Sequence, residues 1–197
     1  MLTKRLAPLD TISAAKFLLG KIMLRKIGNK ELKGKIVETE AYLGEYDLAS
    51  HSFQGETERN RVMFGPAGHA YVYFTYGMHY CLNVVTGPKD TGEAVLIRAL
   101  EPIAGINHMA KNRGISLLSS WNIDTKSLTN GPAKLCQALQ IDKSLNGHDL
   151  SQPPLYLQAS KPANVGAIVT TTRIGIRNGA DLPLRFYIKN NPFVSKQ

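Results

Sequence analysis

The segment 36–43, with the sequence IVETEAYL, limits what this chain can fold into more than any other part of it. Its β-branched and aromatic residues predict a strand, and side chains on a strand alternate between two faces. One face carries both carboxylates and consists of Ile36, Glu38, Glu40 and Tyr42. The opposite face consists of Val37, Thr39, Ala41 and Leu43. Unpaired carboxylates cannot face an apolar core. Their face must therefore meet solvent or line a polar pocket, and the spacing alone leaves both open.

The same alternation predicts further strands, several of them joined by tight turns. The predicted strands are 21–27, 31–43, 71–75, 80–85, 93–100, 167–176 and 184–188. Gly28 and Asn29 form the turn between the first two strands, and Tyr76, Gly77 and Met78 form the tip of a second hairpin.

Three segments predict helices. The first can be capped by Asp10 and ends at Gly20, and its apolar face consists of Ile12, Ala15, Leu18 and Leu19. A second is expected near 105–112. The third begins around Pro132, with Asn130 or Gly131 as its cap, and its apolar face consists of Leu135, Ala138 and Leu139. Because few strands are joined by helical crossovers, we expect a single α+β domain over residues 1–197, with a mainly antiparallel curved sheet and surrounding helices.

Composition excludes several classes of protein. No apolar run reaches the roughly 18 residues of a membrane-spanning helix, and the first residues lack the apolar run of a signal peptide. The two cysteines, Cys81 and Cys136, lie far apart and in no CxxC pair, which argues against a disulfide framework, a zinc ribbon and an iron–sulfur cluster. We therefore expect a protein of a reducing cytoplasm, associated with the nucleoid if the source is bacterial.

Charge points to a polyanionic partner, because the net charge is +9 and the pI is near 9.6. The charge is unevenly distributed. Residues 36–58 hold six acidic and no basic residues, whereas 1–35 hold nine basic and two acidic ones. This acidic island could be a reactive pocket within a nucleic-acid-binding surface. On charge alone, a solvated acidic loop is the simpler interpretation.

Four tyrosines lie within ten positions, at Tyr71, Tyr73, Tyr76 and Tyr80. Aromatic side chains in basic proteins often stack on nucleobases. Tyrosine also packs across ordinary hairpins, which is the simpler interpretation for Tyr71 and Tyr80. It is a weaker interpretation for Tyr76, because a turn tip is a poor place to bury a ring.

The close carboxylates Glu38 and Glu40 admit two kinds of chemistry, general base catalysis and binding of a divalent metal ion. The five histidines form no HExxH or deaminase signature, and no phosphate-binding glycine motif occurs. His51 follows the acidic strand closely enough to return to its pocket. Arg98 shares a strand face with Leu96, and a lone arginine there usually forms an ion pair.

Six segments together resemble the alkyladenine (3-methyladenine) DNA glycosylases. They are IVETEAYLG (36–44), HS (51–52), RNRVMFGPAGHAYVYFTYGMHYCLNV (59–84), LIRALEP (96–102), NGPAKLCQALQI (130–141) and PLRFYI (183–188). The segments follow one another in order over most of the chain. The resemblance implies a single α+β domain that flips a damaged purine out of double-stranded DNA, acts as a monomer and needs no metal or organic cofactor.

The resemblance also implies roles for individual residues. Glu40 is the implied catalytic carboxylate, and Arg98 helps to hold the attacking water and the phosphate. Tyr42 and His51 sandwich the flipped base, and Tyr73 lies across the pocket. The remaining implied roles are orientation of the histidine by Tyr71, exclusion of guanine's 2-amino group by Asn83, a pocket contact by Leu96, insertion into the duplex by Tyr76 and Met78, and structural support by Lys134.

These expectations define a monofunctional glycosylase. No lysine lies in the pocket motifs, so we expect no Schiff base and no strand cleavage, and an abasic site as the product. Two other classes are considered. One is a binding module without catalysis, and the other is a metal-dependent nuclease using Glu38, Glu40 and Asp47. The ordered set of motif residues favours the glycosylase over both.

Overall fold

The computed structural model describes residues 2–75, 77–115, 124–160 and 165–196. Within them the strands are β1 (Ile22–Ile27), β2 (Lys30–Leu43), β3 (Ala70–Thr75), β4 (His79–Thr86), β5 (Glu93–Ala104), β6 (Leu155–Gln158), β7 (Ile168–Thr171) and β8 (Arg185–Ile188). The helices are α1 (Thr11–Leu18), α2 (Ile106–Asn112), α3 (Lys126–Thr129) and α4 (Pro132–Ala138). Short 3₁₀ turns are η1 (Thr3–Arg5), η2 (Gly44–Tyr46), η3 (Arg61–Phe64) and η4 (Lys143–Leu145).

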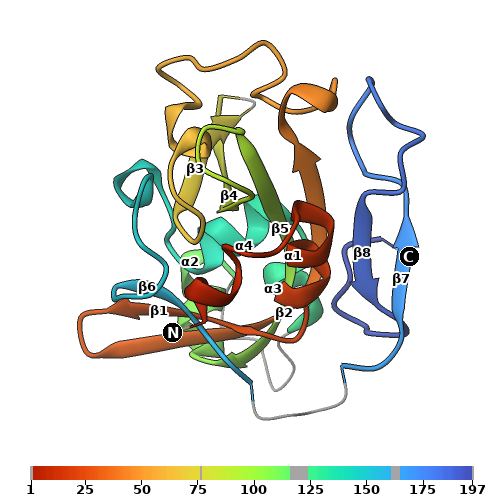
Figure 1. Ribbon diagram of the computed structural model, residues 1–197. Helices are drawn as coiled ribbons and strands as arrows, with labels where there is room; N and C mark the ends of the chain where they lie inside the picture. The colour runs from red at the N-terminus through yellow and green to blue at the C-terminus, as the bar shows by residue number, and fades with distance from the viewer. Residues whose placement is uncertain (1, 76, 116–123, 161–164, 197) are drawn as a thin grey trace.

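The long strand β2 organises a single curled sheet (Figure 1), in which the strand pairs of the described residues are all antiparallel. The sheet runs in the order β3-β4-β5-β2-β1-β6, and β8 joins β2 and carries β7. Along one edge, β2 pairs with β5; along the other, it pairs first with β1 and then with β8. The expected α+β class is confirmed, and strands from both ends of the chain meet on β2.

The pairing of β2 with β5 is irregular where the carboxylates lie. Glu38 is opposite Ala99 and Thr39 is opposite Ile97, so Arg98 has no residue directly opposite on β2. Such bulges redirect side chains and are frequent next to active sites. The expectation of regular alternation over 36–43 was therefore wrong in part, because residues 36–41 are all buried and Ile36 joins the hydrophobic core.

The first helix forms as its sequence predicts. The Asp10 side chain accepts a hydrogen bond from the Ser13 N–H at 2.8 Å, which caps α1. Gly20 follows the helix with a φ of +79°, and its N–H donates to Ile36 O at 2.8 Å. The helix packs against β2, β5 and β8, and lies nearest the viewer in Figure 1.

The other predicted elements were confirmed with one clear error. Both hairpins and the helices at 105–112 and 132–138 are present, and β5 extends past the predicted end to Ala104. The predicted strand 167–176 is wrong, because β7 ends at Thr171. Beyond it, Arg173 and Ile174 form hydrogen bonds with β2 and Asp47 rather than with a sheet neighbour. Strand β6 and helix α3 were not predicted.

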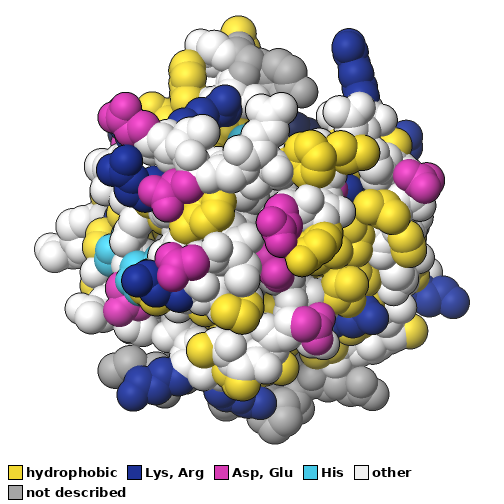
Figure 2. Space-filling model, turned by 45° about the horizontal axis from the view of Figure 1, so that its top comes forward, with side chains coloured by type: hydrophobic (Ala, Val, Ile, Leu, Met, Phe, Trp, Pro, Cys, Tyr) yellow, Lys and Arg dark blue, Asp and Glu magenta, His cyan; other side chains and the backbone are white. Residues whose placement is uncertain are grey.

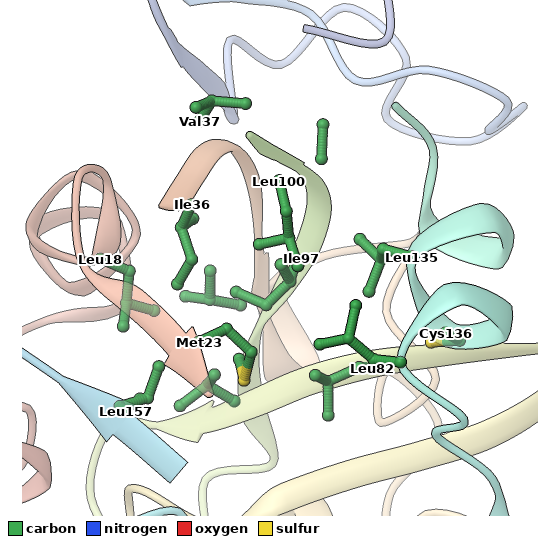
Figure 3. Packing of buried hydrophobic residues seen from close by; sticks show 14 of the residues in the cluster. Leu18, Met23, Ile36, Val37, Leu82, Ile97, Leu100, Leu135, Cys136 and Leu157 are labelled. Carbon is green, nitrogen blue, oxygen red and sulfur yellow. The ribbon is translucent and has the colours of Figure 1, made fainter. Parts of the chain in front are cut away.

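The hydrophobic core lies between the curled sheet and the helices. Ile97 and Leu100 of β5 and Leu82 of β4 point toward Leu135 of α4 (Figure 3). Leu18 of α1 and Leu157 of β6 lie at the other side of the same cluster, so the core links both ends of the sheet. Among the described residues, no helix has the length and apolar character needed to cross a membrane.

A pair of substitutions on β5 tests the position of this core. Ile97 is fully buried, whereas Ile103 on the same strand is 49% exposed. We expect Ile97→Ala to lower the free energy of unfolding by about 2–5 kcal/mol, because it leaves a cavity. Ile103→Ala should change it by less than about 0.5 kcal/mol. Urea denaturation of both variants measures this, and equal losses would contradict the assigned core.

Candidate active site

A pocket of about 340 Å³ is lined in part by residues of the 44–65 loops, and these loops lie at one end of the molecule (Figure 1). Its walls come from β2–β5, the 49–51 loop, the start of α4 and the loop after β7. The lining residues are Tyr42, Ala49, His51, Met63, Tyr71, Tyr73, Thr75, Cys81, Asn83, Leu96, Arg98, Pro132, Ile174, Gly175 and Ile176. Figure 2 brings this end forward and shows basic, acidic and hydrophobic side chains interspersed on the surface.

Glu40 lies behind the pocket wall, fully buried between Tyr42 and Arg98. The Tyr42 hydroxyl donates to Oε2 at 3.0 Å, and the Ile174 N–H donates to Oε1 at 2.8 Å. Arg98 Nη1 lies 3.1 Å from Oε1. Burial raises the pKa of Glu40, although Arg98, the Ile174 N–H and Tyr42 each act to lower it. The Glu40 carboxylate therefore accepts a proton more readily than the carboxylate of an ordinary surface glutamate.

Arg98 is shared between two buried carboxylates. Its Nε donates to Glu38 Oε1 at 3.3 Å, and its Nη1 faces Glu40. Burial alone would lower the pKa of Arg98, but the nearby carboxylates outweigh burial and raise it. The arginine is thus an ion-pair partner, as its strand position suggested, and its side chain also reaches the pocket wall.

Aromatic rings line the opposite wall. His51 Nδ1 lies 2.9 Å from the Tyr71 hydroxyl, and the rings of Tyr71 and Tyr73 stack with centroids 5.4 Å apart. Burial raises the pKa of Tyr71 to about 12, so its hydroxyl stays protonated at neutral pH. Burial also lowers the pKa of His51, and the nearby Arg59 adds to this. A neutral imidazole held by a tyrosine therefore faces the cavity.

Tyr42 is supported from behind by a buried ion pair. The Arg173 guanidinium lies 4.7 Å from the centre of the Tyr42 ring. Arg173 binds both carboxylate oxygens of Asp47, one of them at 2.8 Å, and donates to Ala41 O at 3.0 Å. Sequence reasoning missed Arg173 and the Ile174 N–H, because no local pattern links residues so far from β2.

Asn83 and Leu96 occupy neighbouring positions on the pocket wall. Asn83 lies opposite Tyr71 on β3 and opposite Leu96 on β5. Its Nδ2 donates to Tyr71 O at 3.2 Å, and the side chain is almost fully buried. This bond uses one N–H of Nδ2 and leaves the other N–H able to face a ligand.

The structure brings together most of the residues expected to act together. The residues that meet at the pocket and its wall are Glu40, Tyr42, His51, Tyr71, Tyr73, Asn83, Leu96 and Arg98.

Met78 is 70% exposed at the β3–β4 tip and does not line the pocket, while Tyr76 lies outside the described residues. Lys134 donates to Asn130 Oδ1 at 2.8 Å and does not line the pocket. Tyr80 packs on Phe74 with centroids 5.0 Å apart.

The acidic island divides into two groups. Glu45, Glu56 and Glu58 are exposed, and Glu56 pairs with Arg61. Glu38, Glu40 and Asp47 are fully buried, so interpreting the whole island as a solvated loop is wrong. Each buried carboxylate is paired with arginine, and in the described part of the chain no group of three or more His, Cys, Asp or Glu could hold a metal ion. This arrangement disfavours the nuclease.

Comparison with known proteins points in one direction. The family model described as methylpurine-DNA glycosylase matches residues 5–192. A protein of Carboxydothermus hydrogenoformans is 53% identical over 189 residues, 95% of each chain. One of Methanoculleus marisnigri is 51% identical over 193 residues, again 95% of each chain. One of Legionella pneumophila is 46% identical over 190 residues, 95% of this chain and 93% of its own. All three are provisionally named 3-methyladenine DNA glycosylase.

His51 is partly exposed to solvent, and the desolvation of its ring at the pocket can be tested by titration. Since burial lowers its pKa in the folded protein, we expect NMR to place the midpoint below the value of about 6.5 found in unfolded chains. The unfolded chain then binds the proton more readily, so the His51 contribution to stability is present above about pH 6.5 and is lost as pH falls through the folded midpoint. The His51 ring signals, assigned with His51→Gln, are followed in buffer and in urea. A folded midpoint equal to or above the unfolded one would refute this.

Proposed function

The chain belongs to the methylpurine-DNA glycosylase family, and from this premise we propose that it acts as a monomer on duplex DNA, receives a damaged purine in its pocket and hydrolyses the N-glycosidic bond with Glu40. The observation that carries the proposal is a buried glutamate, paired with Arg98, directly behind an aromatic pocket. A purine ring is flat and apolar on both faces, which matches walls made of Tyr42, His51 and Tyr73.

The aromatic walls can offset the cost of flipping. Extruding a base costs a few kcal/mol, least for a damaged or mispaired one. Stacking on an aromatic side chain returns about 1–3 kcal/mol per base. Tyr42 is held by Arg173 and His51 by Tyr71, so these rings lose little freedom when a base enters.

Glu40 suits a transition state that carries positive charge on the sugar, as in glycoside hydrolysis. In the reaction, the bond between C1′ and the base nitrogen breaks, and the base leaves with the bonding electron pair. A water oxygen forms a new bond to C1′, and its proton passes to Glu40. Arg98 holds the carboxylate in place. No lysine occurs among the pocket-lining residues of the described chain, so the product is an abasic site in an intact strand.

The β3–β4 tip provides a means to hold the duplex open. It joins β3 and β4, and both strands contribute residues to the pocket wall. Met78 projects from the tip into solvent. Apolar side chains inserted between base steps compensate for lost stacking. We assign this role to Tyr76 and Met78 on the family resemblance together with the exposure of Met78.

Replacement of the carboxylate tests the chemistry. Glu40→Gln keeps the size and most hydrogen bonds but removes the proton acceptor. We expect single-turnover excision to fall at least about 100-fold, the low end of the contribution of a general base, while binding to lesion-containing DNA persists. Excision is scored as alkali-labile sites on oligonucleotides that carry single lesions. The matched control is Glu45→Gln, an exposed acid in the same segment, which should excise normally. Near-normal excision by Glu40→Gln would exclude this mechanism.

Asn83 is expected to exclude normal guanine. Its amide N–H₂ and guanine's 2-amino group are both donors, and a buried donor left unpaired costs roughly 1–3 kcal/mol. Asn83→Ser should therefore raise the excision of guanine-type bases relative to adenine-type lesions by about tenfold or more. Asn112→Ser serves as control, because that asparagine also donates to a backbone carbonyl, Ala138 O, but lies outside the pocket. An unchanged preference in Asn83→Ser would count against the assignment.

A further inference from the structure

Glu38 is a buried carboxylate for which the proposed reaction has no direct use, yet it accepts more hydrogen bonds than Glu40. It is fully buried. Its Oε1 accepts from Arg98 Nε at 3.3 Å, Arg185 Nη1 at 2.7 Å and Ser195 Oγ at 3.0 Å. Its Oε2 accepts from the Ser195 N–H at 2.7 Å. A carboxylate with this many partners fixes the groups around it.

The partners of Glu38 are themselves fixed by distant parts of the chain. Arg185 begins β8, donates through Nε to Thr172 O at 3.0 Å and through Nη1 to Lys196 O at 2.8 Å. Ser195 and Lys196 follow β8, and their contacts with Glu38 and Arg185 place them beside the start of that strand. The terminal segment therefore closes over Glu38 from the side away from β5.

Arg98 connects Glu38 to Glu40 in the candidate site. Its guanidinium is planar and rigid, so anchoring Nε on Glu38 determines the direction of Nη1. That nitrogen lies 3.1 Å from Glu40 Oε1. Because Arg98 lies at a bulge with no residue directly opposite on β2, the backbone pairing alone does not set this direction.

We propose that Glu38 is a positioning residue for base excision, which holds Arg98 against Glu40 and is itself held by Arg185 and Ser195. This inference rests on the proposed function, since it concerns the residues assigned there to the chemistry. Glu38 does not line the pocket.

The proposal has an electrostatic consequence at Glu40. The groups that face Glu40 are Arg98 from β5, Tyr42 from β2, Cys81 from β4, and Arg173 and the Ile174 N–H from the loop after β7. Glu38 and its partner Arg185 lie one step further along the same network. Removing the Glu38 charge leaves Arg98 to interact with Glu40 alone and removes a neighbouring negative charge. Both changes favour ionised Glu40, so its pKa should fall.

The test is the pH dependence of single-turnover excision of hypoxanthine from a duplex oligonucleotide. With Glu38→Gln, the acid limb of the profile should move to lower pH by roughly one pH unit. The excision rate on the plateau should fall, but by less than the loss of about 100-fold or more expected for Glu40→Gln. The matched control is Glu101→Gln on β5. Glu101 accepts from Asn191 at 3.0 Å and pairs with Lys35, but does not contact Arg98, so the profile should match that of the unmodified chain.

A second variant covers the case in which Glu38→Gln does not fold. Glu38→Asp keeps the charge but shortens the reach, so the acid limb should stay in place while the plateau falls. An unmoved limb in folded Glu38→Gln, or an unchanged plateau in Glu38→Asp, would overturn the proposal. These failures differ from failure of the proposed function, in which the unmodified chain excises no purine or Glu40→Gln remains active. That result would overturn both.

Discussion

The structure depends on burying three carboxylates, Glu38 and Glu40 where β2 meets β5 and β8, and Asp47 just beyond the end of β2. An ion moved into a protein interior loses several kcal/mol of hydration, and only well-placed partners offset that loss. Arg98, Arg173 and Arg185 supply the opposing charges, and backbone N–H groups from Ile174 and Ser195 supply further donors. The course of the last part of the chain follows from this requirement, because it brings in two of the three arginines and both N–H groups.

The residues of these ion pairs that lie outside the cavity hold other residues, which face it, in place. Asp47 and Arg173 fix the Tyr42 ring without touching the cavity themselves, and Glu38 and Arg185 hold Arg98 in the same way. The cavity then presents rings, one amide and one guanidinium, with the glutamate just behind them. Rigid placement of this kind reduces the entropy lost on binding and keeps reacting groups aligned. A strongly polar interior thus supports an aromatic pocket.

Local patterns in the sequence were sufficient for much of the fold. Asp10 and Gly20 marked the ends of α1, and Gly28 with Asn29 marked the first hairpin. The motif residues of β2–β5 came together because β3, β4 and β5 pair in sequence order and β5 then pairs with β2. Contacts between residues that are far apart in the sequence could not be predicted in this way. The bulge at Arg98, the early end of β7 and the burial of Arg173 all arise from partners more than fifty positions away, and no window of sequence contains both members.

The contact between Glu38 and Ser195 spans 157 positions of the chain, and this separation has a kinetic consequence. Contacts between distant residues close slowly, because the loop entropy is lost before the contact forms. During synthesis, β2 leaves the ribosome long before the strand that neutralises its buried acid. The early hairpins can form meanwhile, but Glu38 must stay hydrated until β8 and the segment after it arrive. The candidate site is consequently assembled only after β8 and the segment that carries Ser195 have been synthesised.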